Sequence, residues 1–392
     1  MRVLHLISSG GLYGIENMLL SLLPSLKKAG CQPVLGVFHN RHCAHTEVAE
    51  AARRSALDVK IIECRGKFDW NAVHQIRTCM REGIDLIHTH GYKSDIYGYI
   101  ANRRSRTPIL TTQHSMELSP PSLLRLYRVL NFHIMGKFHK IVAVSESIAA
   151  ELERRGVPPC KITTINNGID VAQFSTAEPS LTQKASRERI IGLVGRLIPE
   201  KGGREFLHAA QEVAAKFADV SFYFIGAGPY RNVLSELAGE LHIEQRVTFA
   251  GERRDMPGVY ASLDMLVLPS ISEGLPMTLL EALAAKRPVI ATRVGGVSKV
   301  ILHERTGLLV EPGDFAGLRN AMVRLLSDPA LGRQLGGNGC RLIAQEFSAA
   351  AMAQKYMALY QALRRQTREN DSPDSGPQQV PNSPDVEETM QI

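Results

Sequence analysis

A guanidinium and an ammonium lie close together in the sequence, where an apolar run gives way to a helical pattern. Arg196 and Lys201 belong to the stretch Gly-Arg-Leu-Ile-Pro-Glu-Lys-Gly at 195–202, directly after the apolar run 190–194. Two cations that converge at a helix N-terminus neutralise a diphosphate and stabilise its departure. The alternative is a pair of solvated surface cations, but the flanking glycines at a strand–helix turn favour phosphate contact.

Two carboxylates eight residues apart follow a second apolar run. Residues 272–281 read Ser-Glu-Gly-Leu-Pro-Met-Thr-Leu-Leu-Glu. The run 265–268 predicts a buried strand and Pro276 suits the first turn of a helix, so Glu273 lies on a loop and Glu281 about two turns into the helix. The backbone N–H groups of 275–278 form a cradle for phosphate. Carboxylates on loop and helix suit two sets of sugar hydroxyls, as in a nucleotide sugar. The alternative is a solvated acid and a structural helix acid.

The ordered motifs around these glutamates resemble a known donor site. Ser-Glu-Gly-Leu-Pro…Glu-Ala is followed by Arg-Pro-Val-Ile-Ala-Thr and Val-Gly-Gly. This set resembles the signature of family-four retaining glycosyltransferases (glycosyl transferases group 1) with the GT-B fold, and further matches extend over residues 1 to about 363. The resemblance implies that Glu273 serves the transferred sugar and Glu281 the ribose. The implied donor loop comprises Gly274, Leu275, Pro276, Met277 and Thr278.

The resemblance also implies site residues elsewhere. Gly10 and Gly11, after the first apolar run, would form a lip facing the donor phosphate, although a plain tight turn explains them equally well. Gly228, in Gly-Ala-Gly-Pro, resembles the family's glycine turn beside the nucleotide, and 251–253 lie where the family holds the base, largely by backbone. His114, in Thr-Thr-Gln-His, would project into the interdomain cleft and contact the transferred sugar, unless it is a surface-loop histidine.

Apolar runs alternate with helical patterns along most of the chain. The runs that predict strands are 3–7, 33–38, 59–63, 86–88, 109–112, 141–144, 190–194, 221–225, 247–250, 265–268, 288–291 and 307–310. The helical patterns include 17–29, 70–82, 203–217, 231–241 and 314–327. Such alternation predicts an α/β fold with parallel sheets covered by helices. The predicted architecture is GT-B, with two facing doubly wound Rossmann-like domains.

The domain boundaries follow from composition. An Asn-Gly turn at 167–168 and a polar stretch at 175–189 indicate a linker, which divides an acceptor-binding domain, 1–180, from a nucleotide-sugar-binding domain, 181–345. We expect residues 346–365 to form a helix that packs back on the first domain. Residues 366–392 are predicted to be a disordered acidic tail.

Composition constrains the compartment and the partners. The 392 residues contain no apolar run of the ~18 needed to span a bilayer, and the N-terminus has no signal-peptide pattern. Six scattered cysteines indicate free thiols in a reducing cytoplasm. The formal charge is +7, and without the five acids of residues 370–392 it is +12, which favours anionic partners. No zinc-finger or RNA-binding signature accompanies this charge, so we expect no nucleic acid partner.

A metal or other cofactor is not expected. His39, His42, Cys43 and His45 share one loop, but structural zinc generally uses two separated ligand pairs. The chain also lacks the Asp-x-Asp with which the other glycosyltransferase fold class holds a metal-bound diphosphate. Two more histidines, His88 and His90, lie two apart and would share a face of an extended segment. We interpret the first as a packed strand residue and the second as a residue that approaches the acceptor.

A basic amphipathic pattern runs from 123 to 140. An apolar helical stripe faces arginines, and further basic residues flank it on both sides. Two interpretations remain open, an ordinary packed helix or a helix that lies on an anionic membrane. A lipid-linked acceptor would favour the second and place the chain at the inner face of the cytoplasmic membrane.

These patterns and the resemblance together predict a cytoplasmic, retaining glycosyltransferase. It would move a sugar from a UDP- or GDP-sugar to a glycan or lipid-linked acceptor, in cell-surface polysaccharide or lipopolysaccharide biosynthesis. The expected mechanism is front-face attack, in which the departing diphosphate takes the acceptor proton. The alternatives are a nucleotide-sugar epimerase of similar fold and a non-catalytic nucleotide-sugar-binding subunit, which would bind the nucleotide without transfer.

Overall fold

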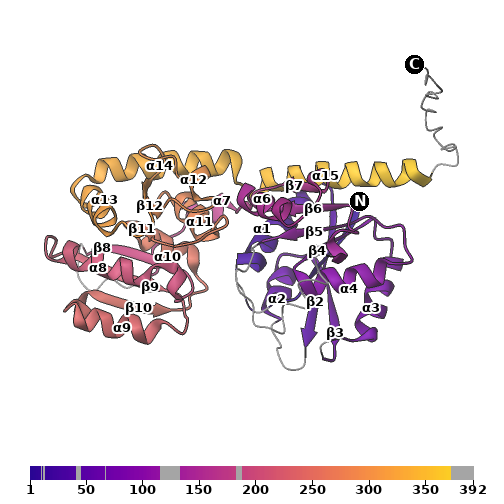
Figure 1. Cartoon of the computed structure of the whole chain (residues 1–392), viewed down its shortest axis with the longest axis horizontal. Helices are drawn as coiled ribbons and strands as arrows, with labels where there is room; N and C mark the ends of the chain where they lie inside the picture. Colours follow the sequence, from indigo (N-terminus) through magenta and orange to yellow (C-terminus); the bar gives the residue numbers. More distant parts are fainter. Residues whose placement is uncertain are drawn as a thin grey trace, which may run out of the picture.

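The computed structural model describes residues 1–9, 11, 14–40, 46–66, 68–114, 133–181 and 188–371. Two parallel sheets lie side by side, each covered by helices (Figure 1). The first has the order β3-β2-β1-β4-β5-β6-β7, from β1 (Arg2–Ile7), β2 (Gln32–Asn40), β3 (Asp58–Cys64), β4 (Leu86–His90), β5 (Ile109–Gln113), β6 (Lys140–Ala143) and β7 (Ile162–Thr164). The second has the order β10-β9-β8-β11-β12-β13, from β8 (Arg189–Val194), β9 (Val220–Ile225), β10 (Val247–Gly251), β11 (Met265–Leu268), β12 (Val289–Thr292) and β13 (Leu308–Val310). The predicted α/β class is confirmed.

Both sheets change direction of winding next to their first strand. In the first sheet β1 pairs with β2 on one side and β4 on the other, and in the second β8 pairs with β9 and β11. In open α/β sheets, ligands bind outside the carboxyl ends of the strands at such a switch point. The loops after β8 and β11 are therefore the place to look for a site in the second sheet.

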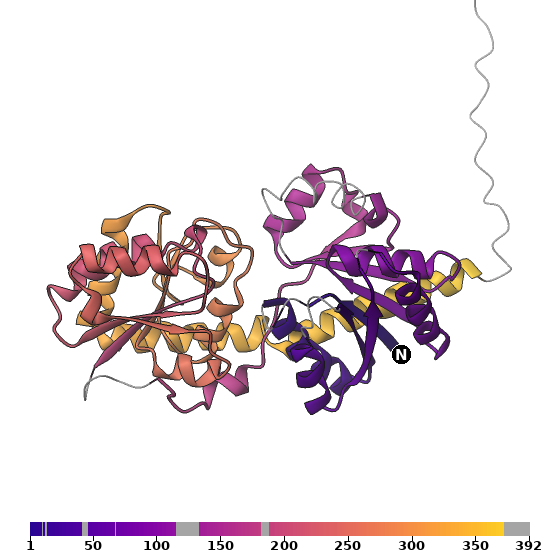
Figure 2. The same ribbon diagram turned by 90° about the horizontal axis from the view of Figure 1, so that it is seen from below.

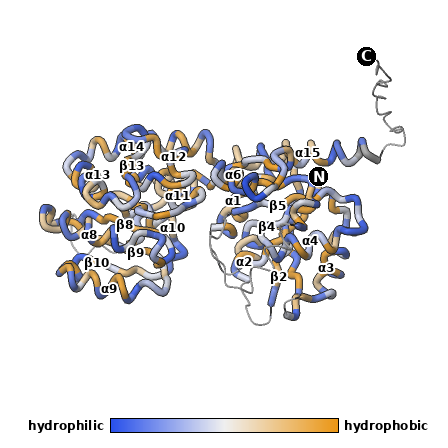
Figure 3. Tube along the Cα trace, in the orientation of Figure 1, coloured by the Kyte–Doolittle hydropathy of each residue, from blue (hydrophilic) through white to orange (hydrophobic). Residues whose placement is uncertain are grey.

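The helices of the first half are α1 (Gly14–Lys28), α2 (Glu47–Arg54), α3 (Trp70–Arg81), α4 (Tyr92–Asn102) and α6 (Glu146–Arg154). Those that follow are α7 (Val171–Ser175), α8 (Gly203–Ala214), α9 (Arg231–Glu240), α10 (Met256–Ser262), α11 (Met277–Ala284), α12 (Val297–Val300), α13 (Phe315–Ser327), α14 (Pro329–Glu346) and α15 (Ala349–Asp371). Apolar and polar residues mix along them (Figure 3), as expected for helices that cover a sheet with one face. No helix in the described part of the chain is both long and apolar enough to cross a bilayer.

The chain returns to the first sheet through α15. Tyr356, Tyr360 and Leu363 of this helix are buried in the same core as Leu22 and Leu26 of α1. Figure 2 shows α14 and α15 running along one side of both halves. This is the predicted crossover helix.

The two passages between the halves are joined by backbone hydrogen bonds. The Ile169 N–H donates to the Phe347 carbonyl over 3.0 Å, and the Ala349 N–H donates to the Ile169 carbonyl over 2.7 Å. The predicted division at residue 180 lies next to 182–187, outside the described residues, and stays a prediction.

The expected start of the C-terminal tail needs correction. The tail was expected to begin at residue 366, but 366–371 belong to α15, because Gln, Thr, Arg and Glu prolong a helix that is already packed. Residues 372–392 lie outside the described part.

In the basic stretch 123–140, only 133–140 are described, and Ile134 and Phe138 there are buried. That segment packs into the first half, while membrane contact by the rest stays a prediction.

Candidate functional site

A partly buried ion pair joins the two loops at the switch point of the second sheet. The Nζ of Lys201 lies 2.5 Å from Oε1 of Glu273, and the Ser270 hydroxyl donates to the same oxygen over 2.7 Å. Only 8% of the Glu273 side chain is exposed, against 23% for Lys201. The loops follow β8 and β11, which are neighbours, so two residues far apart in sequence meet at one edge. The pair places a cation and an anion where a ligand would arrive.

Local geometry around these loops differs in detail from the sequence expectation. Lys201 ends a short 3-10 turn, Pro199–Lys201, and α8 starts after it at Gly203. Pro276 caps α11 with an extended backbone, the helix starts at Met277, and Glu281 is only about one turn in. The amides of Met277 and Thr278 donate to no described backbone carbonyl, so the predicted phosphate cradle has free donors.

Arg196 lies on the same loop as Lys201, just after β8. It is exposed and forms no ion pair with any residue that the structure describes. The loop is compact, with the Ile198 N–H bonded to the Arg196 carbonyl over 3.0 Å. Its guanidinium is therefore free to meet an anion, in contrast to Lys201, which is already shared with Glu273.

Glycines hold the neighbouring backbones close to these loops. A Cβ on Gly228 would overlap the carbonyl of Leu197, so Gly228 packs directly against the loop of Arg196 and Lys201. A Cβ on Gly295 would overlap the carbonyl of Glu273 in the same way, and the Gly296 N–H donates to the Gly274 carbonyl over 2.6 Å. The Val-Gly-Gly motif thus packs against the backbone of the donor loop and holds it in place.

Glu281 is buried and takes no part in the Lys201–Glu273 pair. The Tyr260 hydroxyl of α10 donates to its Oε2 over 2.7 Å. Burial raises the pKa of Glu281 to about 7, although the Tyr260 hydrogen bond opposes that rise. Tyr260 was not predicted, because a tyrosine in an apolar helical pattern gives no signal of its role.

Residues of the first half lie close to the donor loop. A Cβ built on Gly274 would lie 3.8 Å from the His114 carbonyl and 3.6 Å from the Ile148 side chain. One built on Gly14 would lie 3.9 Å from Met277 at the start of α11. Gly11 precedes that contact with φ of 142°, which glycine tolerates, whereas Gly10 lies outside the described residues. The structure thus brings the backbone of His114 and the start of α1 at Gly14 to the donor loop.

Behind His114, the first half contains a row of buried histidines. His5 and His88 are fully buried, and His90 is 3% exposed. His88 bonds to the Tyr360 hydroxyl and to Thr112 Oγ1, each over 2.7 Å, so the interpretation as a packed strand residue is confirmed. His90 contacts His114, whose Nε2 lies 3.4 Å from its Nδ1.

Acid should destabilise the protein through these histidines. Burial lowers the pKa of His5 and of His114 to about 3 and those of His88 and His90 well below their usual value. Between the folded pKa and the unfolded value of about 6.5, only the unfolded chain binds the proton, so stability is complete above pH 6.5 and falls below it. Each such histidine lowers the stability by roughly 1.4 kcal/mol per pH unit once the pH is well below 6.5.

Urea unfolding at about pH 7.5 and 5.5 measures this loss. His5→Phe should reduce the pH dependence by the share of one buried histidine, while His74→Ala, at an exposed histidine of α3, should leave it unchanged. Equal pH dependence in His5→Phe and the parent would contradict the assignment.

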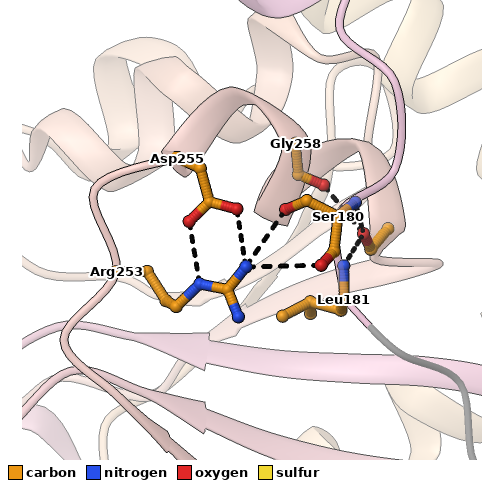
Figure 4. A network of polar contacts seen from close by, with 6 residues as sticks. Ser180, Leu181, Arg253, Asp255 and Gly258 are labelled. Carbon is orange, nitrogen blue, oxygen red and sulfur yellow. Dashed lines mark hydrogen bonds and ion pairs between the residues drawn. The ribbon is translucent and has the colours of Figure 1, made fainter.

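Arg253 has a structural partner rather than a free side chain. It forms two hydrogen bonds with Asp255, over 2.8 and 2.6 Å, and reaches the carbonyl and hydroxyl of Ser180 at 3.3 and 3.4 Å (Figure 4). The guanidinium holds the pKa of Asp255 well below its usual range. Arg253 therefore fastens the end of the first interdomain passage to α10, and a role of the 251–253 backbone at the base stays a prediction.

The loop proposed and rejected as a zinc site is only partly described. His39 Nδ1 lies 3.0 Å from Glu63, while His42, Cys43 and His45 lie outside the described residues. The described cysteines, Cys31, Cys64, Cys79, Cys160 and Cys340, are all free thiols. The expectation that no metal or cofactor is required stays a prediction.

Comparison with known proteins gives consistent matches over both halves. A family profile described as "Glycosyltransferase Family 4" matches residues 13–173, and one described as "Glycosyl transferases group 1" matches 188–328. The chain is 29% identical over 296 residues to N-acetyl-alpha-D-glucosaminyl L-malate synthase of Bacillus anthracis, covering 73% of this chain and 76% of the relative. It is 28% identical over 298 residues to UDP-Gal:alpha-D-GlcNAc-diphosphoundecaprenol alpha-1,3-galactosyltransferase of Escherichia coli, covering 71% and 76%.

The fold also matches solved structures. Anabaena HepE in complex with UDP and glucose superposes with a TM-score of 0.79 at 20% identity, over 92% of this chain and 100% of that one. At this identity the match establishes the architecture of two facing α/β halves, which was the predicted one.

Proposed function

The chain belongs to glycosyltransferase family 4, and from this premise we propose that it is a retaining enzyme that uses a nucleotide-diphosphate sugar. Its glycosyltransferase activity follows from the family and from its relatives. The stereochemical outcome, the donor and the acceptor are the proposed part. We propose a UDP- or GDP-sugar as the donor and a glycan or lipid-linked sugar as the acceptor.

The observation that carries the proposal is the Lys201–Glu273 pair beside the free Arg196. An arriving diphosphate finds one exposed guanidinium, one partly exposed ammonium and the free amides of Met277 and Thr278. Positive charge that is already in position stabilises a leaving diphosphate most strongly as it departs. Glu273 then faces the transferred sugar, and His114 approaches it from the other half.

In the proposed reaction an acceptor hydroxyl oxygen attacks the anomeric carbon on the side from which the diphosphate departs. The bond from carbon to the phosphate oxygen breaks, and that oxygen takes the acceptor proton. Glu273 and Glu281 accept hydrogen bonds from sugar and ribose hydroxyls, a role unlike that of the flanking acid and nucleophile of a glycosidase. Positioning and charge stabilisation supply most of the acceleration.

The acceptor proposal draws on the relatives. The galactosyltransferase relative is named for a diphosphoundecaprenol-linked acceptor. We propose a comparable role for this chain in cell-surface polysaccharide or lipopolysaccharide synthesis, at the cytoplasmic face of the membrane. Its net charge of +7 suits an anionic membrane surface and a diphosphate-bearing acceptor.

A thermal-shift screen of UDP, GDP and their sugars, followed by measurement of donor hydrolysis, tests the proposal. A nucleotide at 100 times its Kd should stabilise the protein by about 2.7 kcal/mol. Binding of the nucleotide with neither hydrolysis nor transfer would favour the non-catalytic subunit, and conversion of the donor to its epimer would favour an epimerase.

Chelation should leave the activity intact. We expect the proposed site to neutralise the diphosphate with Arg196, Lys201 and backbone amides, so no divalent cation is required. The measurement is donor turnover before and after dialysis against EDTA. Full loss that magnesium or manganese restores would contradict the prediction.

Glu281→Gln should raise the donor KM more than it lowers kcat. The ribose is unchanged by the reaction, so its hydrogen bonds are equally strong in the ground and transition states. Because the pKa of Glu281 is about 7, the donor KM of the parent should also rise as pH falls below 7, and the variant should lose that dependence. Steady-state kinetics with varied donor at saturating acceptor measures both effects, and a fall in kcat at constant KM would reverse the assigned role.

A further inference from the structure

Three imidazole rings form a continuous line from the core of the first half to His114. His5 Nδ1 lies 3.2 Å from His90 Nε2, and His90 Nδ1 lies 3.4 Å from His114 Nε2. The rings of His5 and His90 are almost parallel, at 11°, with centroids 5.5 Å apart, which suits an in-plane N–H···N contact. The line ends in His5 Nε2, which is buried and has no partner within the described part of the chain.

A metal is the obvious alternative occupant, because ring nitrogens of His5, His88 and His90 lie within 4.8 Å of one another. Both nitrogens of His88 are already committed, to Tyr360 and Thr112 at 2.7 Å. That leaves two ligands, fewer than the three or four protein ligands of a zinc site. A hydrogen-bonded line of neutral rings fits the contacts better.

Neutral imidazole carries one N–H, so the line has only two fully bonded arrangements. In the first, His5 donates to His90, His90 donates to His114, and the unpaired His5 Nε2 is a bare lone pair. In the second, every proton points the other way, and His5 Nε2–H is a buried donor without an acceptor. A buried unpaired N–H is rarer in proteins than an under-satisfied acceptor, so the first arrangement is favoured.

We infer that His90 and His5 are positioning residues that fix His114 as the Nδ1–H tautomer, with that N–H presented as a donor to the transferred sugar. Nδ1 of His114 forms no hydrogen bond with any described residue, whereas its Nε2 contacts His90. Burial lowers the pKa of His114 to about 3, so the ring stays neutral and offers a directed donor rather than a charge. The inference rests on the proposed function in one respect, namely that the group accepting the hydrogen bond from His114 belongs to the transferred sugar.

Nitrogen NMR of the full-length protein with 15N-labelled histidine tests the tautomer directly. The His114 signals are assigned by their loss in His114→Asn. We expect a protonated Nδ1 and an unprotonated Nε2 at neutral pH. In His90→Phe, and in His5→Phe, we expect the signals to move toward the Nε2–H tautomer that free imidazole side chains prefer in water.

Kinetics supply the second readout. His90→Phe should lower kcat for donor hydrolysis about tenfold, the scale of one hydrogen bond, and leave the donor KM nearly unchanged. Tyr360→Phe is the matched control, because it removes a buried hydrogen bond from His88 and leaves the line of three rings intact. It should change neither the His114 tautomer nor kcat.

Several outcomes would overturn the inference. They are an Nε2–H tautomer of His114 in the parent protein, a tautomer that both phenylalanine variants leave unchanged, an equal effect of Tyr360→Phe, or loss of the His5 and His90 signals on addition of Zn²⁺ alone. The parent spectrum decides even if neither variant folds. It needs no donor or acceptor, so it stands or fails separately from the proposed function.

Discussion

Arg196→Ala and Lys201→Ala should each lower turnover by a factor of about 100 or more, the scale for losing one preorganised charge donor. The two side chains differ in their surroundings in the parent protein. Arg196 is exposed and forms no ion pair with a described residue, whereas the Nζ of Lys201 lies 2.5 Å from Glu273. Arg196→Ala should therefore leave the fold unchanged. Lys201→Ala also leaves a buried carboxylate without its cation and should lower the melting temperature.

Steady-state donor turnover and thermal unfolding separate these effects. Arg204→Ala is a matched control, because it removes an exposed cation from the first turn of α8 on the same connection. It should retain turnover within a small factor. Unchanged turnover in both Arg196→Ala and Lys201→Ala would remove the phosphate assignment.

Glu273→Gln should lower kcat by about 10- to 100-fold with a smaller change in the donor KM. The transferred sugar gains positive charge as its bond breaks, so a carboxylate beside it binds the transition state more tightly than the ground state. Glutamine keeps the shape and can still accept from Ser270, but it carries no charge. The same change removes the partner of Lys201.

Glu200→Gln is the control for this variant, because it neutralises an exposed acid on the neighbouring loop. Its kinetics should match those of the parent. If Glu273→Gln changes only KM while Glu281→Gln changes kcat, the two carboxylates have exchanged roles. If neither changes either constant, the Glu-x7-Glu stretch is structural.

The strands were predictable because parallel strands buried on both faces are continuous apolar runs. β7 was missed, since its three residues, Ile162–Thr164, are only half-buried and too short to give a pattern. α14 was missed because glycines interrupt its helical pattern. The start of the helix nevertheless has a clear signal, because Pro329 is its first residue and the side chain of Asp328, just before it, accepts a hydrogen bond from the Leu331 N–H. One of the glycines, Gly336, lies so close to Lys286 that a Cβ would overlap the Lys286 carbonyl.

The site was predictable as far as strand ends determine it. Loops after adjacent parallel strands meet at one edge, so Lys201 and Glu273 were expected in one region. Their direct contact spans 72 residues of sequence, and that between His5 and His90 spans 85. No periodicity encodes such pairs. The hydrogen bond between Tyr260 and Glu281 could not be predicted for the same reason, because the two residues belong to different helices.

The central proposal is retention at an anomeric centre whose leaving diphosphate is held by Arg196 and Lys201. Proton NMR during hydrolysis of an α-linked nucleotide sugar tests it without knowledge of the acceptor. The account predicts that the first free sugar to appear is the α anomer, before mutarotation, and that Arg196→Ala and Lys201→Ala each lower its rate of formation by about 100-fold or more. A first product with the β configuration, or a rate in both variants that is unchanged from the parent, would contradict it.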